Sequence, residues 1–156
     1  MVGYLSEYDN LVILKAFTKL YGMAGIRLGY CLCSNIRVID ALYRCGAPWN
    51  VSSLAQAAGI AALEDRNHVR RGRRIVRQER PLLIEALESF GVTQIFGEAN
   101  YLLFKSRPGL CEQLREKGIL IRNCANYCGL TDGWYRIAVR TERENGKLIE
   151  ALKEVL

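Results

Sequence analysis

The sequence predicts an α/β protein that ends in a small α+β domain with a core of its own. Half of the 156 residues are hydrophobic, which is enough to bury a core. Two short apolar runs flank a glycine-rich turn near the start of the chain. From about residue 66 onward the expected elements follow the order α-β-β-α-β-β-α. We therefore expect two parts, residues 1–62 and residues 63–156.

The first part is expected to hold two strands and two helices. Aliphatic and β-branched side chains predict a short buried strand over residues 11–16 and a second strand over residues 26–33. Each helix follows a polar residue that can cap it. These are Asn35 before a helix over 36–45 that Gly46 and Pro48 end, and Ser52 or Ser53 before an alanine-rich helix from Leu54 to about Leu63.

The second part is expected to begin with a long helix. Apolar residues recur at helical steps from Val69 to Phe90, which predicts a single apolar stripe that stops at Gly91. Pro81 lies inside this helix and should kink or break it.

Shorter elements are expected to complete the second part. They are strands over 93–96, 101–105, 119–123 and 134–140, and a helix over 108–117 that Gly118 closes. A last helix follows a capping box made by Thr141 and Glu144. Its residues Leu148, Leu152 and Val155 should face one side.

The charge balance restricts the partners of the chain. Lys and Arg outnumber Asp and Glu by 22 to 16, a net charge of +6 that suits nucleic acid, lipid headgroups or a small phosphorylated or carboxylated ligand. Seven arginines fall within residues 66–80, but no aromatic residues alternate with them. A solvated helix face explains this run better, so we expect no nucleic acid and no membrane partner.

Targeting and metal-binding signals are weak. No window approaches the roughly 20 apolar residues that cross a bilayer. Residues 1–10 lack the basic and apolar blocks of a signal peptide, so we expect a cytoplasmic protein. None of the six cysteines forms a C-x-x-C pair, and the one histidine, His68, is expected at the surface. We therefore expect no metal site and buried, unpaired thiols.

The segment from Thr18 to Gly29 carries the clearest chemistry. Lys19 follows a predicted strand, where a desolvated amine can act as a nucleophile. Arg27 lies beyond a glycine-rich turn and could return to bind a phosphate group. An amine beside a phosphate site is what pyridoxal phosphate needs. A lysine and an arginine on a solvated loop are the alternative.

This segment resembles the cofactor-lysine motif of class I/II (fold-type I) pyridoxal-phosphate-dependent aminotransferases. The matching residues are Phe17, Thr18, Lys19, Gly22, Met23, Gly25, Arg27, Leu28 and Gly29. The resemblance implies that Lys19 forms the Schiff base and moves the proton at the substrate Cα. It also implies that Arg27 and Thr18 bind the cofactor. Ala16 departs from the motif, since the family usually has Ser, Thr or Gly there, and this implies weaker cofactor binding.

Four further segments, residues 48–56, 98–104, 118–124 and 134–141, resemble the histidinol-phosphate aminotransferase branch. They imply that Arg136 binds the substrate carboxylate. Arg122 would bind a distal phosphate, and Asn100 would also contact the substrate. For Arg136 the alternative is an exposed position on a strand whose other face holds Tyr135, Ile137 and Val139. The residues around Arg122 and Cys124 look closest to threonine-phosphate decarboxylases.

The resemblance implies that the chain is the C-terminal part of such an enzyme. Residues 1–62 would be the end of the cofactor-binding large domain with the interdomain helix, and residues 63–156 the complete small domain. In the family, the residues that hold the cofactor ring precede the lysine, and only 18 residues precede Lys19. We therefore expect this chain alone to be inactive. Whether it keeps its cofactor is open.

The implied reaction transfers an amino group between an amino acid or phosphorylated amine and a 2-oxo acid. The first alternative is a threonine-phosphate decarboxylase-like lyase. The second is a catalytically inactive domain that acts only through association. Apolar segments at 11–14, 26–33 and 54–63 would then lie exposed, and we expect them to favour a homo-oligomer.

Overall fold

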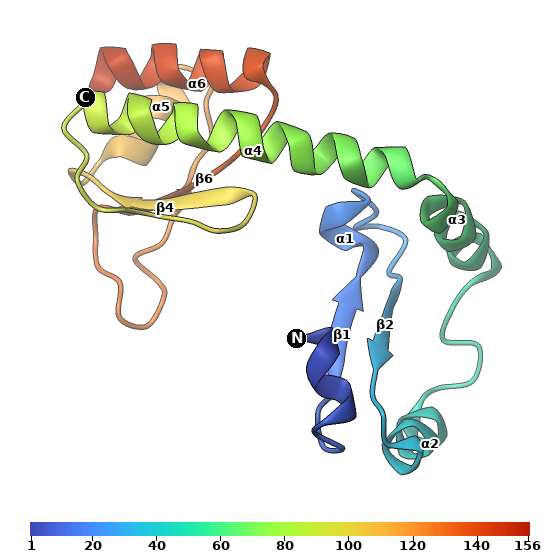
Figure 1. The fold of residues 1–156 in the computed structure, drawn as a ribbon. Helices are drawn as coiled ribbons and strands as arrows, with labels where there is room; N and C mark the ends of the chain where they lie inside the picture. Colours follow the sequence, from blue (N-terminus) through green and yellow to red (C-terminus); the bar gives the residue numbers. More distant parts are fainter. The chain divides into compact units, whose positions relative to one another are not determined.

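The computed structural model describes all 156 residues, which divide into two compact units (Figure 1). The N-terminal unit spans Met1–Arg70 and the C-terminal unit spans Arg71–Leu156. The boundary falls inside the long helix α4, Arg66–Ser89, whose first turn belongs to the N-terminal unit. No helix is both long and apolar enough to span a bilayer.

The N-terminal unit is built on a two-stranded antiparallel sheet. Strand β1, Ile13–Ala16, pairs with β2, Gly29–Leu32, in a register that sets Ile13 opposite Leu32. Both predicted strands are thus confirmed. The predicted burial of the first strand is wrong, because only Ile13 is buried and Leu14 is 79 % exposed. A two-stranded sheet buries little surface unless another element covers it.

Helices fill the rest of the N-terminal unit. They are the 3₁₀ helix η1 (Val2–Ser6), α1 (Phe17–Leu20), α2 (Ile36–Cys45) and α3 (Ser53–Glu64). The sequence predicted α2 and α3 but neither η1 nor α1. The predicted caps are confirmed: the Asn35 side chain accepts a hydrogen bond from the Arg37 N–H at 3.0 Å. The Ser52 hydroxyl accepts one from the Ala55 N–H at 3.1 Å, so Ser52, and not Ser53, is the cap of α3.

The C-terminal unit packs three helices on one face of a four-stranded antiparallel sheet (Figure 1). The strands are β3 (Ile95–Phe96), β4 (Tyr101–Lys105), β5 (Arg122–Asn123) and β6 (Trp134–Ala138), in the order β3-β4-β6-β5. The helices are α4, α5 (Leu110–Glu116) and α6 (Glu142–Val155). All four predicted strands and all three predicted helices are present, most of them shorter than expected.

Alternation along the two central strands creates the core of the C-terminal unit. Leu102 and Phe104 of β4 and Tyr135 and Ile137 of β6 are buried against the helices. Burial raises the pKa of the Tyr135 hydroxyl. This hydroxyl accepts a hydrogen bond from the Leu110 N–H and donates one to the Arg107 carbonyl, so it ties β6 to the start of α5.

Pro81 was predicted to kink or break α4. The helix runs through Pro81 without interruption, so the prediction of a break at this residue is wrong. Proline removes a single backbone hydrogen bond, whereas the buried Leu83 and Leu87 hold the following turns against the core. The predicted stop at Gly91 is confirmed. The N–H groups of Gly91 and Val92 donate to the carbonyls of Glu88 and Leu87, the pattern of a Schellman motif.

The arginine-rich run is mostly a solvated face of α4, as predicted, but Arg80 is an exception. Arg80 is half-buried and its guanidinium donates to the carbonyls of Glu98 and Ala99, 2.6 and 3.3 Å away. It thus holds the turn that enters β4.

The cysteines are all unpaired. Cys111 and Cys124 are buried as predicted, and burial raises the pKa of the Cys111 thiol. Cys45 and Cys128 are exposed, so the prediction of buried thiols is wrong for these two. Cys45 is the last residue of α2, none of whose residues is buried, and Cys128 lies in the turn between β5 and β6.

Candidate functional site

Lys19 lies on α1, the single helical turn that directly follows β1. The first residue of this turn, Phe17, is buried and anchors it. Thr18 is half-buried, and the Lys19 side chain is exposed. The sequence therefore places the amine on a short element that is fixed to a strand at one end and open to solvent at Lys19.

The segment between β1 and β2 is a closed connection that also carries Arg27. The Phe17 N–H donates to the Leu28 carbonyl at 3.1 Å, and this bond joins the two ends of the connection. At Gly29 an added Cβ would lie 2.8 Å from the Lys15 carbonyl oxygen, so the strands can approach only because this residue is glycine. Lys19, Thr18 and Arg27 thus belong to one connection at one end of the sheet.

Arg27 has a backbone conformation that few residues other than glycine adopt. Its φ is +58°, in the left-handed region, and its side chain is exposed. Such a conformation costs of order 1–3 kcal/mol and concentrates at functional sites. The local strain supports the prediction that Arg27 has a role beyond a solvated loop.

His68 is packed against this connection, although the sequence predicted a surface position. The residue is half-buried at the start of α4. Its Nε2 atom lies 3.0 Å from the Leu20 carbonyl oxygen, and its ring stacks on Tyr21 with centroids 5.9 Å apart. No local sequence pattern predicts this contact, because 48 positions separate the two hydrogen-bonded residues.

The two arginines predicted to bind substrate lie opposite each other in the C-terminal unit. Arg122 of β5 pairs in register with Arg136 of β6, so the two exposed guanidinium groups leave the same face of the sheet. Like charges directly opposite each other destabilise a sheet. An anion such as a carboxylate or phosphate would remove that cost, so the pair is suited to an anionic ligand.

Each of these arginines also lies over an aromatic ring. The Arg136 guanidinium is 5.1 Å from the Tyr101 ring centroid, and the Arg122 guanidinium is 5.7 Å from that of Tyr127. These contacts hold the long side chains in place by cation–π attraction. Tyr101 is not among the site residues that the sequence predicts. The strand register identifies it, because it sets Tyr101 opposite Ala138, two residues beyond Arg136.

Asn100 lies just before β4, beside Tyr101, with an exposed side chain. Its carbonyl accepts a hydrogen bond from the Val139 N–H at 2.8 Å, which extends the β4–β6 pairing by one step. The structure therefore brings Asn100, Arg122 and Arg136 onto one sheet. Their roles toward a substrate stay predictions.

A cleft of about 470 Å³ opens beside Arg136 in the C-terminal unit. Its walls come from the loop before β5, the end of β6 and the start of α6. They include Ile119, Ile121, Arg136, Arg140, Glu144 and Lys147. Three cations and one carboxylate line this cleft, a balance that again favours anions.

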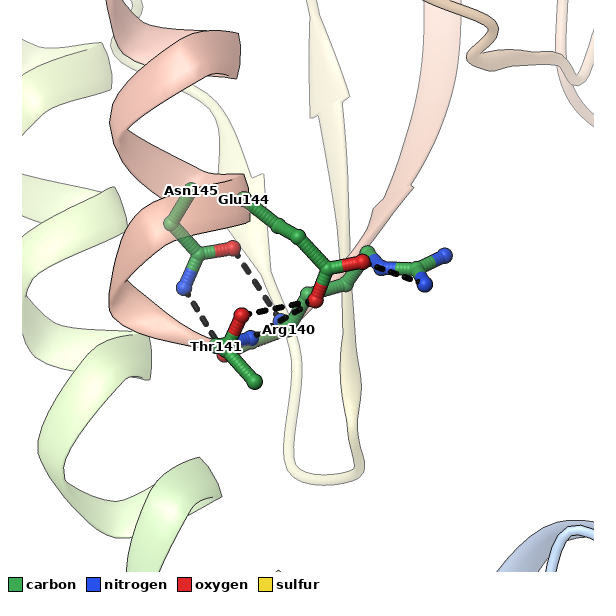
Figure 2. A network of polar contacts seen from close by, with 4 residues as sticks. All are labelled: Arg140, Thr141, Glu144 and Asn145. Carbon is green, nitrogen blue, oxygen red and sulfur yellow. Dashed lines mark hydrogen bonds and ion pairs between the residues drawn. The ribbon is translucent and has the colours of Figure 1, made fainter.

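A polar network fixes the wall of the cleft where β6 leads into α6 (Figure 2). The Glu144 carboxylate accepts hydrogen bonds from the hydroxyl and the N–H of Thr141, which confirms the predicted capping box. It also lies 2.6 Å from the Arg140 guanidinium. The ion pair with Arg140 and the hydrogen bonds from Thr141 lower the pKa of the Glu144 carboxyl to about 2.

Asn145 adds a buried contact to the same network, as Figure 2 shows. Its side-chain oxygen accepts from the Arg140 N–H at 3.1 Å, and its side-chain NH₂ donates to the Arg140 carbonyl at 3.0 Å. The NH₂ group also donates to the Glu79 carboxylate at 2.9 Å. One buried side chain therefore holds both backbone polar groups of Arg140, just after the strand that carries Arg136.

The fold is that of the fold-type I aminotransferases. The family model "Aminotransferase class I and II" matches residues 2–152, and the chain belongs to that family. The lysine-bearing connection and the arginine-bearing sheet are thus parts of one family fold, as the sequence predicted.

The similar proteins carry more specific names. A histidinol-phosphate aminotransferase of Symbiobacterium thermophilum is 39 % identical over 97 % of this chain, which spans 42 % of that protein. The crystal structure of the histidinol-phosphate aminotransferase from Clostridium acetobutylicum matches 99 % of this chain and 48 % of its own, with a TM-score of 0.94 and 34 % identity. A decarboxylase from Sulfurospirillum multivorans gives a TM-score of 0.81 and 30 % identity over 99 % of this chain and 42 % of its own.

The matches also show how the length of this chain compares with that of its relatives. It spans less than half the length of the relatives that it matches. The relatives therefore show the fold of the part that this chain represents.

Proposed function

We propose that this chain provides the lysine-bearing and substrate-carboxylate-binding parts of a pyridoxal-phosphate-dependent aminotransferase. In this proposal residues 1–62 are the end of the cofactor-binding domain and residues 63–156 form the small domain. The main support is that Lys19 and Arg27 belong to the same closed connection between β1 and β2, in a chain of this family. The substrate would be an amino acid or a phosphorylated amine such as histidinol phosphate, with a 2-oxo acid as amino acceptor.

The residues present suit the cofactor in charge and chemistry. Lys19 offers an exposed primary amine to an aldehyde, and Arg27 offers an exposed guanidinium to a phosphate. Thr18 is next to Lys19 and would add a hydroxyl contact. Pyridoxal phosphate, when bound, supplies an electron sink for the charge that develops at the substrate Cα.

Each protein group then has a separate task. Lys19 attaches the cofactor and moves a proton to and from the substrate Cα. Arg136 binds the α-carboxylate as a planar fork, and its contact with the Tyr101 ring keeps the guanidinium in place. Arg122, directly opposite, would bind a second anionic group such as a distal phosphate. Asn100 borders the same sheet face and would contact the substrate.

A decarboxylase is the second candidate, and the observation in its favour is the 30 % identity to the decarboxylase of Sulfurospirillum multivorans. The same lysine and arginines serve both reactions, because the choice depends on which substrate bond is cleaved. The curated relatives named histidinol-phosphate aminotransferase reach 39 % identity, which favours the transferase.

We expect pyridoxal phosphate followed by borohydride to label Lys19 in the purified chain. The labelled peptide is identified by mass spectrometry, and the exposed Lys15 in the neighbouring strand serves as the internal control. Lys19→Arg should remove this label and leave labelling of Lys15 unchanged. Arg27→Gln should lower the labelling of Lys19 about tenfold at limiting cofactor, because it removes a charge-assisted contact to phosphate.

Equal labelling of Lys15 and Lys19 in the wild-type chain would contradict the proposal. So would unchanged Lys19 labelling in the Arg27→Gln variant, because the phosphate would then have no site on this connection.

We further propose that the chain associates with itself through the N-terminal unit. Helix α3 is apolar over most of its surface, a pattern typical of a helix that is covered on all sides. Yet Leu54, Ile60 and Leu63 are 69 %, 61 % and 58 % exposed. An apolar cleft of about 570 Å³ lies between this helix and β2. Surfaces of this kind favour association.

Sedimentation velocity should therefore show dimers or larger species at micromolar concentration. The double variant Ile60→Glu/Leu63→Glu should shift the chain toward monomer, because it places two charges on the exposed face of α3. A matched double variant on the solvated face of α4, Arg73→Glu/Arg77→Glu, should leave the association unchanged. A wild-type chain that stays monomeric at high concentration would refute the proposal.

A further inference from the structure

The Lys19 turn is held from outside by a residue that the proposed function does not use. Helix α1 has four residues, too few for a helix to be stable alone. The carbonyl groups at its end find no partner inside the helix, and the Lys19 carbonyl accepts a hydrogen bond from the Gly22 N–H just beyond it. The position of Lys19 therefore depends on contacts that the rest of the N-terminal unit makes with this turn.

His68 makes two such contacts. Its Nε2 atom lies 3.0 Å from the carbonyl oxygen of Leu20, the residue that follows Lys19. Because a carbonyl can only accept, this ring nitrogen must carry the hydrogen. The bond provides a partner for one of the terminal carbonyls of α1.

The second contact completes a column of three rings. The His68 ring stacks on Tyr21 at 5.9 Å and an interplanar angle of 13°. Tyr21 stacks in turn on Phe17 at 4.9 Å and 26°. Phe17 is only 4 % exposed, so the column runs from a buried anchor to the imidazole. It fixes the residues on both sides of Lys19.

The helix start that carries His68 is itself capped. The Asp65 carboxylate accepts a hydrogen bond from the backbone N–H of His68 at 2.9 Å, so it caps the start of α4. His68 therefore projects from a capped helix onto the Lys19 turn. The ring contacts with Leu20 and Tyr21 then set the direction of the imidazole.

We propose that His68 is a positioning residue for Lys19. It acts through the Leu20 carbonyl and the Tyr21 ring and does not touch the cofactor. Catalytic groups need placement within about half an ångström, and neighbouring contacts supply it. The inference rests on the proposed function of Lys19. It means that a residue in the first turn of α4 determines the position of Lys19.

Three substitutions separate the two contacts. His68→Phe keeps a ring on Tyr21 and removes the hydrogen bond. His68→Gln keeps an N–H donor and removes the ring, and His68→Ala removes both. Asn67→Ala is the matched control, because Asn67 is exposed at the preceding position of the same helix.

The first measurement needs no cofactor. The amide protons of Tyr21, Gly22 and Met23 donate to carbonyls of the Lys19 turn, so their hydrogen exchange reports on it. We expect exchange about tenfold faster in His68→Ala and about fivefold faster in His68→Phe. His68→Gln should return most of the protection. Wild-type exchange rates in His68→Phe, or equal acceleration in Asn67→Ala, would overturn the proposal.

The second measurement is the rate of borohydride-fixed labelling by pyridoxal phosphate. The ratio of Lys19 to Lys15 labelling should fall about fivefold in His68→Ala and recover in His68→Gln. A fall of equal size at both lysines would mean general unfolding and would refute a positioning role. If the wild-type chain gives no label at Lys19, the proposed function fails, while amide exchange still decides whether His68 holds the turn.

Discussion

Replacing Asn145 by alanine is expected to lower the free energy of unfolding of the C-terminal unit by about 2–4 kcal/mol. Asn145 is 3 % exposed and makes three hydrogen bonds, two to the backbone of Arg140 and one to Glu79. Alanine would leave these partners without the side chain that satisfies them, in a place where water has little access. Unpaired buried polar groups are more costly than the hydrogen bonds are favourable.

Urea unfolding followed by Trp134 fluorescence measures this loss. Trp134 lies in β6 of the same unit, and the other tryptophan, Trp49, is 97 % exposed and can be replaced by phenylalanine in every variant. Arg143→Ala is the matched control, since Arg143 is an exposed residue of the same helix turn. It should change the free energy by no more than about 0.5 kcal/mol. Equal effects of the two substitutions would show that the network in Figure 2 does not stabilise the unit.

Asn145→Asp extends the test to charge. A carboxylate at this position keeps the acceptor for the Arg140 N–H but faces the Glu79 carboxylate and the Arg140 carbonyl. These neighbours would raise the folded-state pKa of the new carboxyl above its unfolded value. The aspartate variant should therefore be most stable, relative to wild type, below its unfolded pKa of about 4. Its deficit should grow as the pH rises through the folded pKa.

Local features of the fold were predictable because their physics is local. The caps at Asn35, Ser52 and Thr141 and the stop at Gly91 depend on residues within one turn of each helix end. The alternation of β6 likewise follows from neighbouring residues. Such signals can be read from the sequence because they do not depend on residues far along the chain.

Features that depend on distant partners were not predictable. The burial of β1 depends on what covers a two-stranded sheet, and the sequence of the strand does not record it. The contact of His68 with Leu20 crosses 48 positions, and the contact of Arg136 with Tyr101 requires the β4–β6 register. Helix α4 passes Pro81 because the packing of Leu83 and Leu87 in the following turns outweighs one lost hydrogen bond.

Asn145 is an intermediate case. It lies three positions before Leu148 and seven before Leu152, so it belongs to the apolar stripe of α6. A polar residue inside such a stripe is a signal of a buried hydrogen-bonded group.

The candidate site was predictable where its residues belong to one sequence motif, as Lys19 and Arg27 do. The cross-strand placement of Arg122 and Arg136 came only with the sheet.

Two glycine-to-alanine substitutions in the C-terminal unit are expected to change stability in opposite directions. Gly133 precedes β6 with φ at +90°, and a Cβ there would lie 2.4 Å from the Ser106 carbonyl oxygen. That backbone cannot easily retreat, because the Ser106 N–H donates to the Gly133 carbonyl at 2.8 Å. Strain and overlap together should lower the free energy of unfolding by about 3–5 kcal/mol.

Gly146 is the matched counterpart within the same unit. It lies inside α6, where φ is not positive and a Cβ would meet no atom within 4 Å. Alanine there restricts the unfolded chain and favours the helix, so Gly146→Ala should raise the free energy of unfolding by about 0.5–1 kcal/mol. The Trp134 signal reports both variants. A gain in stability for Gly133→Ala would mean that the turn into β6, and with it the placement of Arg136, is not held as the Ser106 contact requires.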